Sequence, residues 1–298
     1  MAKLSGKSYG AIVLFLTALI WGFTFSYQVM AAQSVKPFAL NTIRMMLGAI
    51  CLFAFLAIKR DCKFNKKDIL GGSVCGFFIF AASACQQFGI SMYSPEESAA
   101  GKAGFITALY IIIVPIFSIF FKKKPNITLL ISLLFAVPGM YLLCVKSNVG
   151  LSSADVALLG AAFLFAGQIL SVEYFMKSSD PVKLSTWQLF FGSCFSFVCT
   201  LLFEQNRINN LSQAIFPILF IGIMSNGIAY TLQIYGQKKL NEASVASLIM
   251  SLESVFAALS GLILLGERLT PIEIAGCVMV FLGVIIAQIK TDKRKKIA

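Results

Sequence analysis

The sequence contains no histidine, only 13% charged residues and two tryptophans. Without histidine there is no H-E-x-x-H zinc motif, and the eight cysteines form no C-x-x-C pair, so zinc sites and a disulfide scaffold find no support. No G-x-x-x-x-G-K-[ST] loop is present to bind ATP. We therefore expect no metal site, no cofactor and no ATP-driven motor.

Long apolar runs dominate what is present. Hydrophobic residues make up 58% of the chain and the mean hydropathy is +0.84, which is typical of a polytopic membrane protein. Only helices satisfy their backbone groups in lipid when apolar runs are this long. The sequence therefore predicts an all-α polytopic membrane protein with ten transmembrane helices. The predicted spans are Tyr9–Ala31, Ala39–Ile58, Ile69–Ile90, Ala99–Phe121, Thr128–Val145, Asp155–Phe175, Leu184–Phe203, Ala214–Tyr235, Ala243–Leu265 and Ile272–Ile289.

A net charge of +12 could indicate a nucleic-acid-binding protein, but the distribution of the charges argues against that function. Most Lys and Arg residues lie in the short gaps between apolar runs, where they orient spans. With the N-terminus in the cytoplasm, the inner gaps and the tail collect 19 Lys and Arg residues and the outer gaps collect 4. This bias predicts a multi-pass protein of the cytoplasmic membrane with both termini in the cytoplasm, the basic C-terminal tail included.

The spans repeat when the chain is slid on itself by 145 residues. Leu14, Gly22 and Ser26 of the first span then meet Leu159, Gly167 and Ser171 of the sixth. The pattern predicts two five-helix repeats, residues 1–147 and 148–298. Because five is an odd number, the second repeat enters the membrane upside down, and inverted repeats are typical of secondary transporters.

Glu253 is the only charged residue in the ninth predicted span, and it lies near the span's centre. A carboxylate at that depth costs about 2.5–3.5 kcal/mol on insertion scales, so lipid exposure is unfavourable. It could be a protonated or hydrogen-bonded packing residue. We favour a place on a solvated pathway through the protein.

Other deep polar residues are few. Arg44 is expected to pair in the interior, whereas Lys102 could either line a cavity or snorkel to the outer headgroups. Asn226, Tyr230 and Gln233 share one helix face at i, i+4, i+7 spacing, which should look inward. No catalytic residue is expected. The candidates for binding a substrate or a coupling ion are Glu253, Arg44, Lys102, Trp21, Gln86, Tyr110, Gln168, Asn226, Tyr230 and Gln233.

Several motifs carry a family resemblance across the whole chain. They are Trp21-Gly-Phe-Thr-Phe in the first span, Pro37 to Arg44 opening the second, and Leu252-Glu253 followed by Gly266-Glu-Arg-Leu, Gly276 and Gly283. Together with the span pattern they resemble the EamA type of the drug/metabolite transporter superfamily. One departure is Ser254, where that family often has a proline directly after the glutamate.

The resemblance implies export or exchange of small metabolites, often amino acids, by alternating access through a central cavity. The expected partners are a small-molecule substrate, the lipid bilayer and a proton or other coupling ion, with no nucleic acid; a homodimer stays open. A channel and an intramembrane enzyme are the alternatives. A channel needs more deep polar residues to line its pore, and an enzyme finds no support because every aspartate lies at a span end or in a gap.

Overall fold

The structure is a computed structural model that describes residues 6–93, 99–120, 127–142, 152–205, 208–209 and 211–288. These residues fold almost entirely into helices and contain no β-strand. The α-helices are α1 (Gly6–Ala32), α2 (Pro37–Ile58), α3 (Lys66–Met92), α4 (Ala99–Thr107), α5 (Tyr110–Phe120), α6 (Ile127–Leu142), α7 (Ser153–Phe175), α8 (Pro181–Phe203), α9 (Leu211–Leu219), α10 (Tyr230–Leu240), α11 (Ala243–Met250), α12 (Glu253–Ser260) and α13 (Pro271–Gln288), and the π-helices are η1 (Phe220–Ala229) and η2 (Gly261–Leu265).

The predicted spans are present in this architecture. Eight helical segments of the described chain are long and apolar enough to cross a membrane, and two shorter apolar helices, Ile127–Leu142 and Pro271–Ala287, complete the set. The prediction of an all-α ten-helix membrane protein is confirmed. Some loop charges lie outside the described residues, among them the basic tail and Lys122–Lys124. The predicted boundary between the two repeats, at 147/148, lies outside them as well.

Polar residues at the helix starts explain where several spans begin. Asn65 and Asp68 form a reciprocal capping box at the start of α3, and Ser152 and Asp155 form one at the start of α7. The helix α2 instead begins with Pro37, whose missing N–H costs nothing in a first turn.

The two halves pack as inverted repeats. In the exchange of halves, α3 corresponds to the eighth span (α9, η1 and α10), α7 to α1, and α8 to α2. Helix α3 packs along α7, and the eighth span packs along α1 in the same way. Likewise α3 packs on α8, and η1 packs on α2. The pairs α2 with α8 and α6 with α13 each exchange into themselves, and α4 with α12 exchanges into α11 with α5. A packing pattern that is unchanged when the halves are exchanged is what a two-fold relation between repeats produces.

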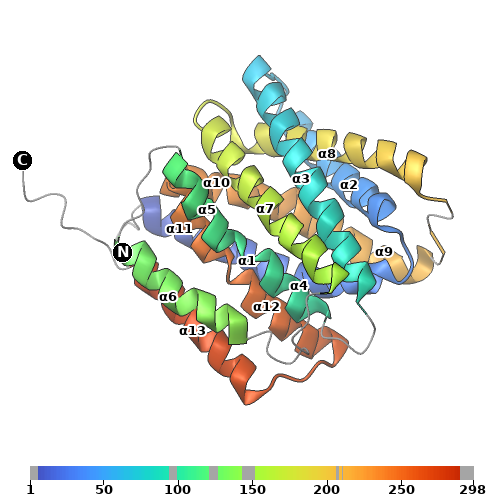
Figure 1. Cartoon of the computed structure of the whole chain (residues 1–298). Coiled ribbons are helices and arrows are strands. Elements are labelled where there is room, and N and C mark those ends of the chain that lie inside the picture. The colour runs from blue at the N-terminus through green and yellow to red at the C-terminus, as the bar shows by residue number, and fades with distance from the viewer. Residues whose placement is uncertain are drawn as a thin grey trace, which may run out of the picture.

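The pair α6 and α13 lies side by side at one edge of the bundle (Figure 1). Glycines permit its close approach from both sides. A Cβ atom added at Gly139 would lie 2.8 Å from the Gly276 carbonyl oxygen, and one at Gly283 would lie 2.8 Å from the Ser132 carbonyl oxygen. Small residues bring helices together in lipid because packing, rather than hydrophobicity, drives their association there.

Three spans are interrupted, which the sequence analysis did not predict. The fourth span breaks at Ala108–Leu109, between α4 and α5, and the ninth breaks at Ser251–Leu252, between α11 and α12. The offset of 145 residues moves the first break to residues 253–254, so the two breaks lie within two residues of corresponding places in the two halves. In the eighth span the interruption is the ten-residue π-helix η1.

Candidate functional site

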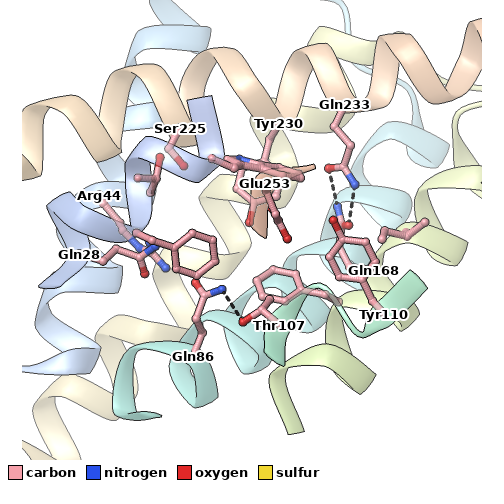
Figure 2. Close-up of a pocket in the computed structure, with 15 residues that line it drawn as sticks. Gln28, Arg44, Gln86, Thr107, Tyr110, Gln168, Ser225, Tyr230, Gln233 and Glu253 are labelled. Carbon is pink, nitrogen blue, oxygen red and sulfur yellow. Dashed lines mark hydrogen bonds between the residues drawn. The ribbon is translucent and has the colours of Figure 1, made fainter. Parts of the chain in front are cut away.

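A polar cavity lies between the two halves, deep within the bundle (Figure 2). It is small, with a volume of about 30 Å³, which is room for about one or two water molecules. The first half contributes α1, α2, α3, α4 and α5, and the second half contributes α7, η1, α10 and α12. The lining residues are Trp21, Thr24, Phe25, Gln28, Arg44, Gln86, Thr107, Tyr110, Phe165, Gln168, Ile169, Ser225, Tyr230, Gln233 and Glu253.

Two oppositely charged side chains face this cavity. Arg44, from α2, is 3% exposed, and Glu253, from α12, is 4% exposed. They form no ion pair with each other or with any other described residue, and the Arg44 Nε and Glu253 Oε1 atoms have no hydrogen-bond partner there. Interior pairing, expected for Arg44, is therefore not observed within the described chain.

The break in the ninth span positions Glu253. Leu252 N–H donates to the Ile249 carbonyl and Ser254 N–H to the Ser251 carbonyl, so the chain tightens into i, i−3 bonds there. The hydroxyls of Ser251 and Ser254 each donate to a carbonyl three residues back, at 2.7 and 2.8 Å. The Ser251 hydroxyl bonds the Leu248 carbonyl, which loses the Leu252 N–H to Ile249 at the break, so the span is interrupted here without a proline at position 254.

Glu253 consequently lies in the first turn of a half-helix, where the positive end of the helix dipole favours a negative charge. Tyr110 occupies a similar place, because it is the first residue of α5 directly after the break in the fourth span. Its buried hydroxyl interacts with the Glu253 carboxyl group, although the two do not meet the full geometry of a hydrogen bond. Both half-helices thus begin at the cavity.

Three glutamines close one side of the cavity with a hydrogen-bonded cluster. Gln168 Nε2 donates to Gln233 Oε1 at 3.3 Å, and Gln233 Nε2 donates back to Gln168 Oε1 at 3.0 Å (Figure 2). Gln168 Nε2 also donates to Gln188 Oε1 at 3.2 Å. All three side chains come from the second half. On the other side, Gln86 Nε2 donates to Thr107 Oγ1 at 3.3 Å, which ties α3 to α4.

The π-helix η1 changes which residue lies below Tyr230. The Tyr230 N–H bonds to the Ser225 carbonyl, five residues back, so Ser225 takes the place on the cavity that i, i+4 spacing predicted for Asn226. The side chain of Asn226 instead packs against Gly48, where an added Cβ would lie 2.9 Å from the Asn226 Cβ. Asn226 is buried and faces the interior together with Tyr230 and Gln233, but of these three residues it alone does not line this cavity.

Lys102 neither lines the cavity nor reaches out freely to headgroups. Its ammonium lies 3.0 Å from Asp155 Oδ1 and 4.8 Å from the ring centre of Tyr93, whose hydroxyl also donates to Asp155 at 2.5 Å. Because Lys102 starts the fourth span and Asp155 starts the sixth, this ion pair joins the two halves. A second such pair, Lys183 with Asp61 at 2.6 Å, joins them at the opposite ends of their spans.

Several lining residues escaped the sequence analysis. In α1 the lining residues Trp21, Thr24, Phe25 and Gln28 follow i, i+3, i+4, i+7 spacing, so the helical face was readable once Trp21 had been singled out. Helical spacing does not identify Ser225, because no pattern in the sequence predicts the π-helix. Among the described residues no group of three or more His, Cys, Asp or Glu side chains could hold a metal ion.

Comparison with known proteins agrees with this architecture. The model of the EamA-like transporter family matches twice, at residues 8–145 and 152–288. An uncharacterized transporter of Archaeoglobus fulgidus is 32% identical over 95% of this chain and 87% of its own length. The uncharacterized transporter YoaV of Bacillus subtilis is 22% identical over 93% and 96%. A solved crystal structure aligns with a TM-score of 0.77 at 15% identity, covering 94% of this chain and 98% of that one, and so shares its fold.

Proposed function

This chain belongs to the EamA-like transporter family and is a multi-pass membrane transporter, and from that premise we propose that it is a secondary carrier of small zwitterionic metabolites such as amino acids. In this proposal the carrier exports or exchanges its substrate by alternating access. The bound substrate occupies the polar cavity between the two halves.

The observation that carries the proposal is the pair of buried, unpaired charges at Arg44 and Glu253. An unpaired charge in the interior costs several kcal/mol, and a fold keeps such groups where function needs them. Both side chains face one cavity but do not pair with each other. A ligand with a carboxylate at one end and an ammonium at the other supplies both missing partners at once.

Each charge suits one end of such a ligand. The Arg44 guanidinium offers a fork of donors that matches a carboxylate in a bidentate pair. Glu253 accepts either the substrate ammonium or a proton. Since the two cations compete for one carboxylate, protonation from outside releases the substrate there, which would couple export to proton entry.

The cavity needs to widen before such a ligand fits, because its present volume holds only about one or two waters. Alternating access supplies that change when the inverted repeats rock against each other. The two ion pairs between the halves, Lys102 with Asp155 and Lys183 with Asp61, would then act as latches on the two sides of the membrane. In the present conformation both latches are closed.

The distribution of Lys and Arg supports a cytoplasmic-membrane location with both termini inside. A channel is less well supported, because a cavity with room for only about one or two water molecules provides no wide polar path. An enzyme is also less well supported. Gly6-Lys-Ser-Tyr-Gly has the G-x-S-x-G spacing of a hydrolase nucleophile, but it lies within the continuous helix α1 and the chain has no histidine.

The proposal is tested with purified protein in proteoliposomes loaded with a mixture of radiolabelled amino acids. Glu253→Gln removes the carboxylate with little change in shape, so we expect efflux to fall about 100-fold or to lose its response to an inward proton gradient. Glu242→Gln is the matched control, because Glu242 precedes α11 and makes no capping hydrogen bond. Unchanged efflux with an unchanged proton response in Glu253→Gln would remove Glu253 from the mechanism.

A further inference from the structure

A second, larger concavity lies on the outer surface of the bundle, and its lining is apolar where that of the central cavity is polar. It is an apolar groove of about 530 Å³ that runs along α7, with Phe78 of α3 on one side and Phe117 of α5 on the other. Figure 1 shows α7 lying between α3 and α5, and both neighbours pack against it. The floor is formed by small residues, Gly167 and Ser171.

The groove uses the opposite face of α7 from the transport site. Gln168 and Ile169 point into the central cavity, whereas Gly167, Leu170 and Ser171 line the groove. Phenylalanines predominate on the groove walls, and no glutamine or asparagine contributes to them. A substrate that needs Arg44 and Glu253 therefore finds neither charge here.

The length of the groove matches one leaflet of a bilayer. It extends along α7 from Phe163 to Lys177, just past the end of the helix. The apolar stretch from Phe163 to Phe175 covers about 18 Å at 1.5 Å per residue, and half of a 30 Å hydrocarbon core is about 15 Å. Since α7 crosses the membrane, this stretch lies at the depth of lipid acyl chains.

The two ends of the groove differ in charge. Its inner end, near the middle of the span, is apolar, and its other end carries the exposed ammonium of Lys177. Lys238 adds a second cation nearby, since its Nζ donates to the Ser179 carbonyl at 2.9 Å. Glu173 also lines this end, but it is 5% exposed and its Oε1 accepts the Ala243 N–H at 2.9 Å, so its charge is directed toward the start of α11.

We propose that this groove binds one anionic phospholipid, with an acyl chain between Phe78 and Phe117 and the phosphate at Lys177. An apolar trough one leaflet deep with a cation at the headgroup level is complementary to such a lipid in both shape and charge. The site is independent of the proposed transport substrate, so either assignment can fail without the other.

The experiment is native mass spectrometry of the purified full chain after exchange into phosphatidylglycerol or phosphatidylcholine. We expect one phosphatidylglycerol to remain bound per chain at detergent concentrations that remove phosphatidylcholine. Lys177→Gln should weaken that retention about fivefold, because one lysine near a membrane surface contributes roughly that factor. Ser171→Phe should fill the floor and abolish retention of the acyl chain.

Lys59→Gln is the matched control, since Lys59 is another cation at a span end but lies away from the groove, over the ring of Phe55. A phosphatidylglycerol with a photoreactive acyl chain should crosslink to α5 and α7 in the wild type and not in Ser171→Phe. Equal retention of the two lipids would overturn the proposal. So would retention unchanged by both groove variants, or a lipid-free dimer whose protomers crosslink across the groove.

Discussion

Arg44 is charged at every physiological pH, so its burial without a partner has a cost that the rest of the fold must offset. The same holds for Glu253 whenever it is ionised. These two residues differ from Lys102, which is also largely buried but is paired with Asp155 and stacked on Tyr93. The contrast separates charges kept for a ligand from charges kept for the structure.

Substitution of each cation should therefore change stability in opposite directions. Arg44→Met removes an unpaired buried charge, and we expect the apparent melting temperature of the ligand-free protein to rise by about 2–4 °C, corresponding to about 1 kcal/mol. Lys102→Met leaves Asp155 without its cation and should lower it by a similar amount. Thermal unfolding of the two purified variants measures both effects, and a marked destabilisation by Arg44→Met would mean that Arg44 has a structural partner.

At the scale of helices, the broken fourth and ninth spans bring two half-helix starts to the cavity. Serine hydroxyls support the break in the ninth span, because they bond to carbonyls three residues back. The π-helix in the eighth span shifts the register by one residue, so that Ser225 lines the cavity in place of Asn226. Interrupted backbone of this kind is stable at membrane depth only where protein or a cavity surrounds it.

The break at Ser251–Leu252 predicts where proline is tolerated. Ser254 lies in the first turn of α12, where the fixed φ of proline fits and only the i, i−3 bond to the Ser251 carbonyl is lost, so Ser254→Pro should fold and retain efflux within about twofold. Ala257→Pro lies in the interior of the same helix and should cost about 3 kcal/mol or more, with loss of folded protein. Size-exclusion profiles and proteoliposome efflux test both. Failure of Ser254→Pro to fold would show that the break depends on the serine bonds alone.

At the scale of the whole molecule, two inverted halves enclose the cavity and are joined by an ion pair at each side. Lys102 with Asp155 joins the fourth span to the sixth, and Asp61 with Lys183 joins the segment after the second span to the seventh. The first half supplies the cation in one pair and the anion in the other.

The pair of Lys102 and Asp155 should show energetic coupling. The side chains are 13% and 5% exposed, so solvent screens their attraction only partly. In a cycle of Lys102→Met, Asp155→Asn and the double variant, we expect the double variant to be more stable than the sum of the singles by about 1–2 kcal/mol. Denaturation of the three variants gives this value. A coupling energy near zero would mean that the ion pair does not stabilise the contact between the two halves.

Orientation is tested through Cys62, which is exposed in the segment after α2. A membrane-impermeant thiol reagent should label it in inverted vesicles and leave it unlabelled in intact cells, if the basic segments face the cytoplasm. Cys62→Ser is the control and should remove the labelling. Labelling of Cys62 in intact cells would reverse the proposed topology.

Much of this protein follows from the sequence alone, because in a bilayer the solvent dictates helix number, length and charge bias. Ten spans, two repeats and the depth of Glu253 all follow from apolar length and from the rarity of charge within it. Even the cavity face of α1 was readable, since Trp21 and Gln28 keep helical spacing.

Only the tertiary structure decided where the helices are interrupted and which polar groups meet. Lys102 was a cavity candidate until packing placed it beside Asp155, and Asn226 was displaced because a π-turn altered the register. Such breaks are stabilised by contacts between spans and by local hydroxyl bonds, which leave no periodic signal in the chain. The absence of an ion pair at Arg44 and Glu253 is likewise a property of the assembled bundle, because it depends on which side chains the neighbouring helices place beside them.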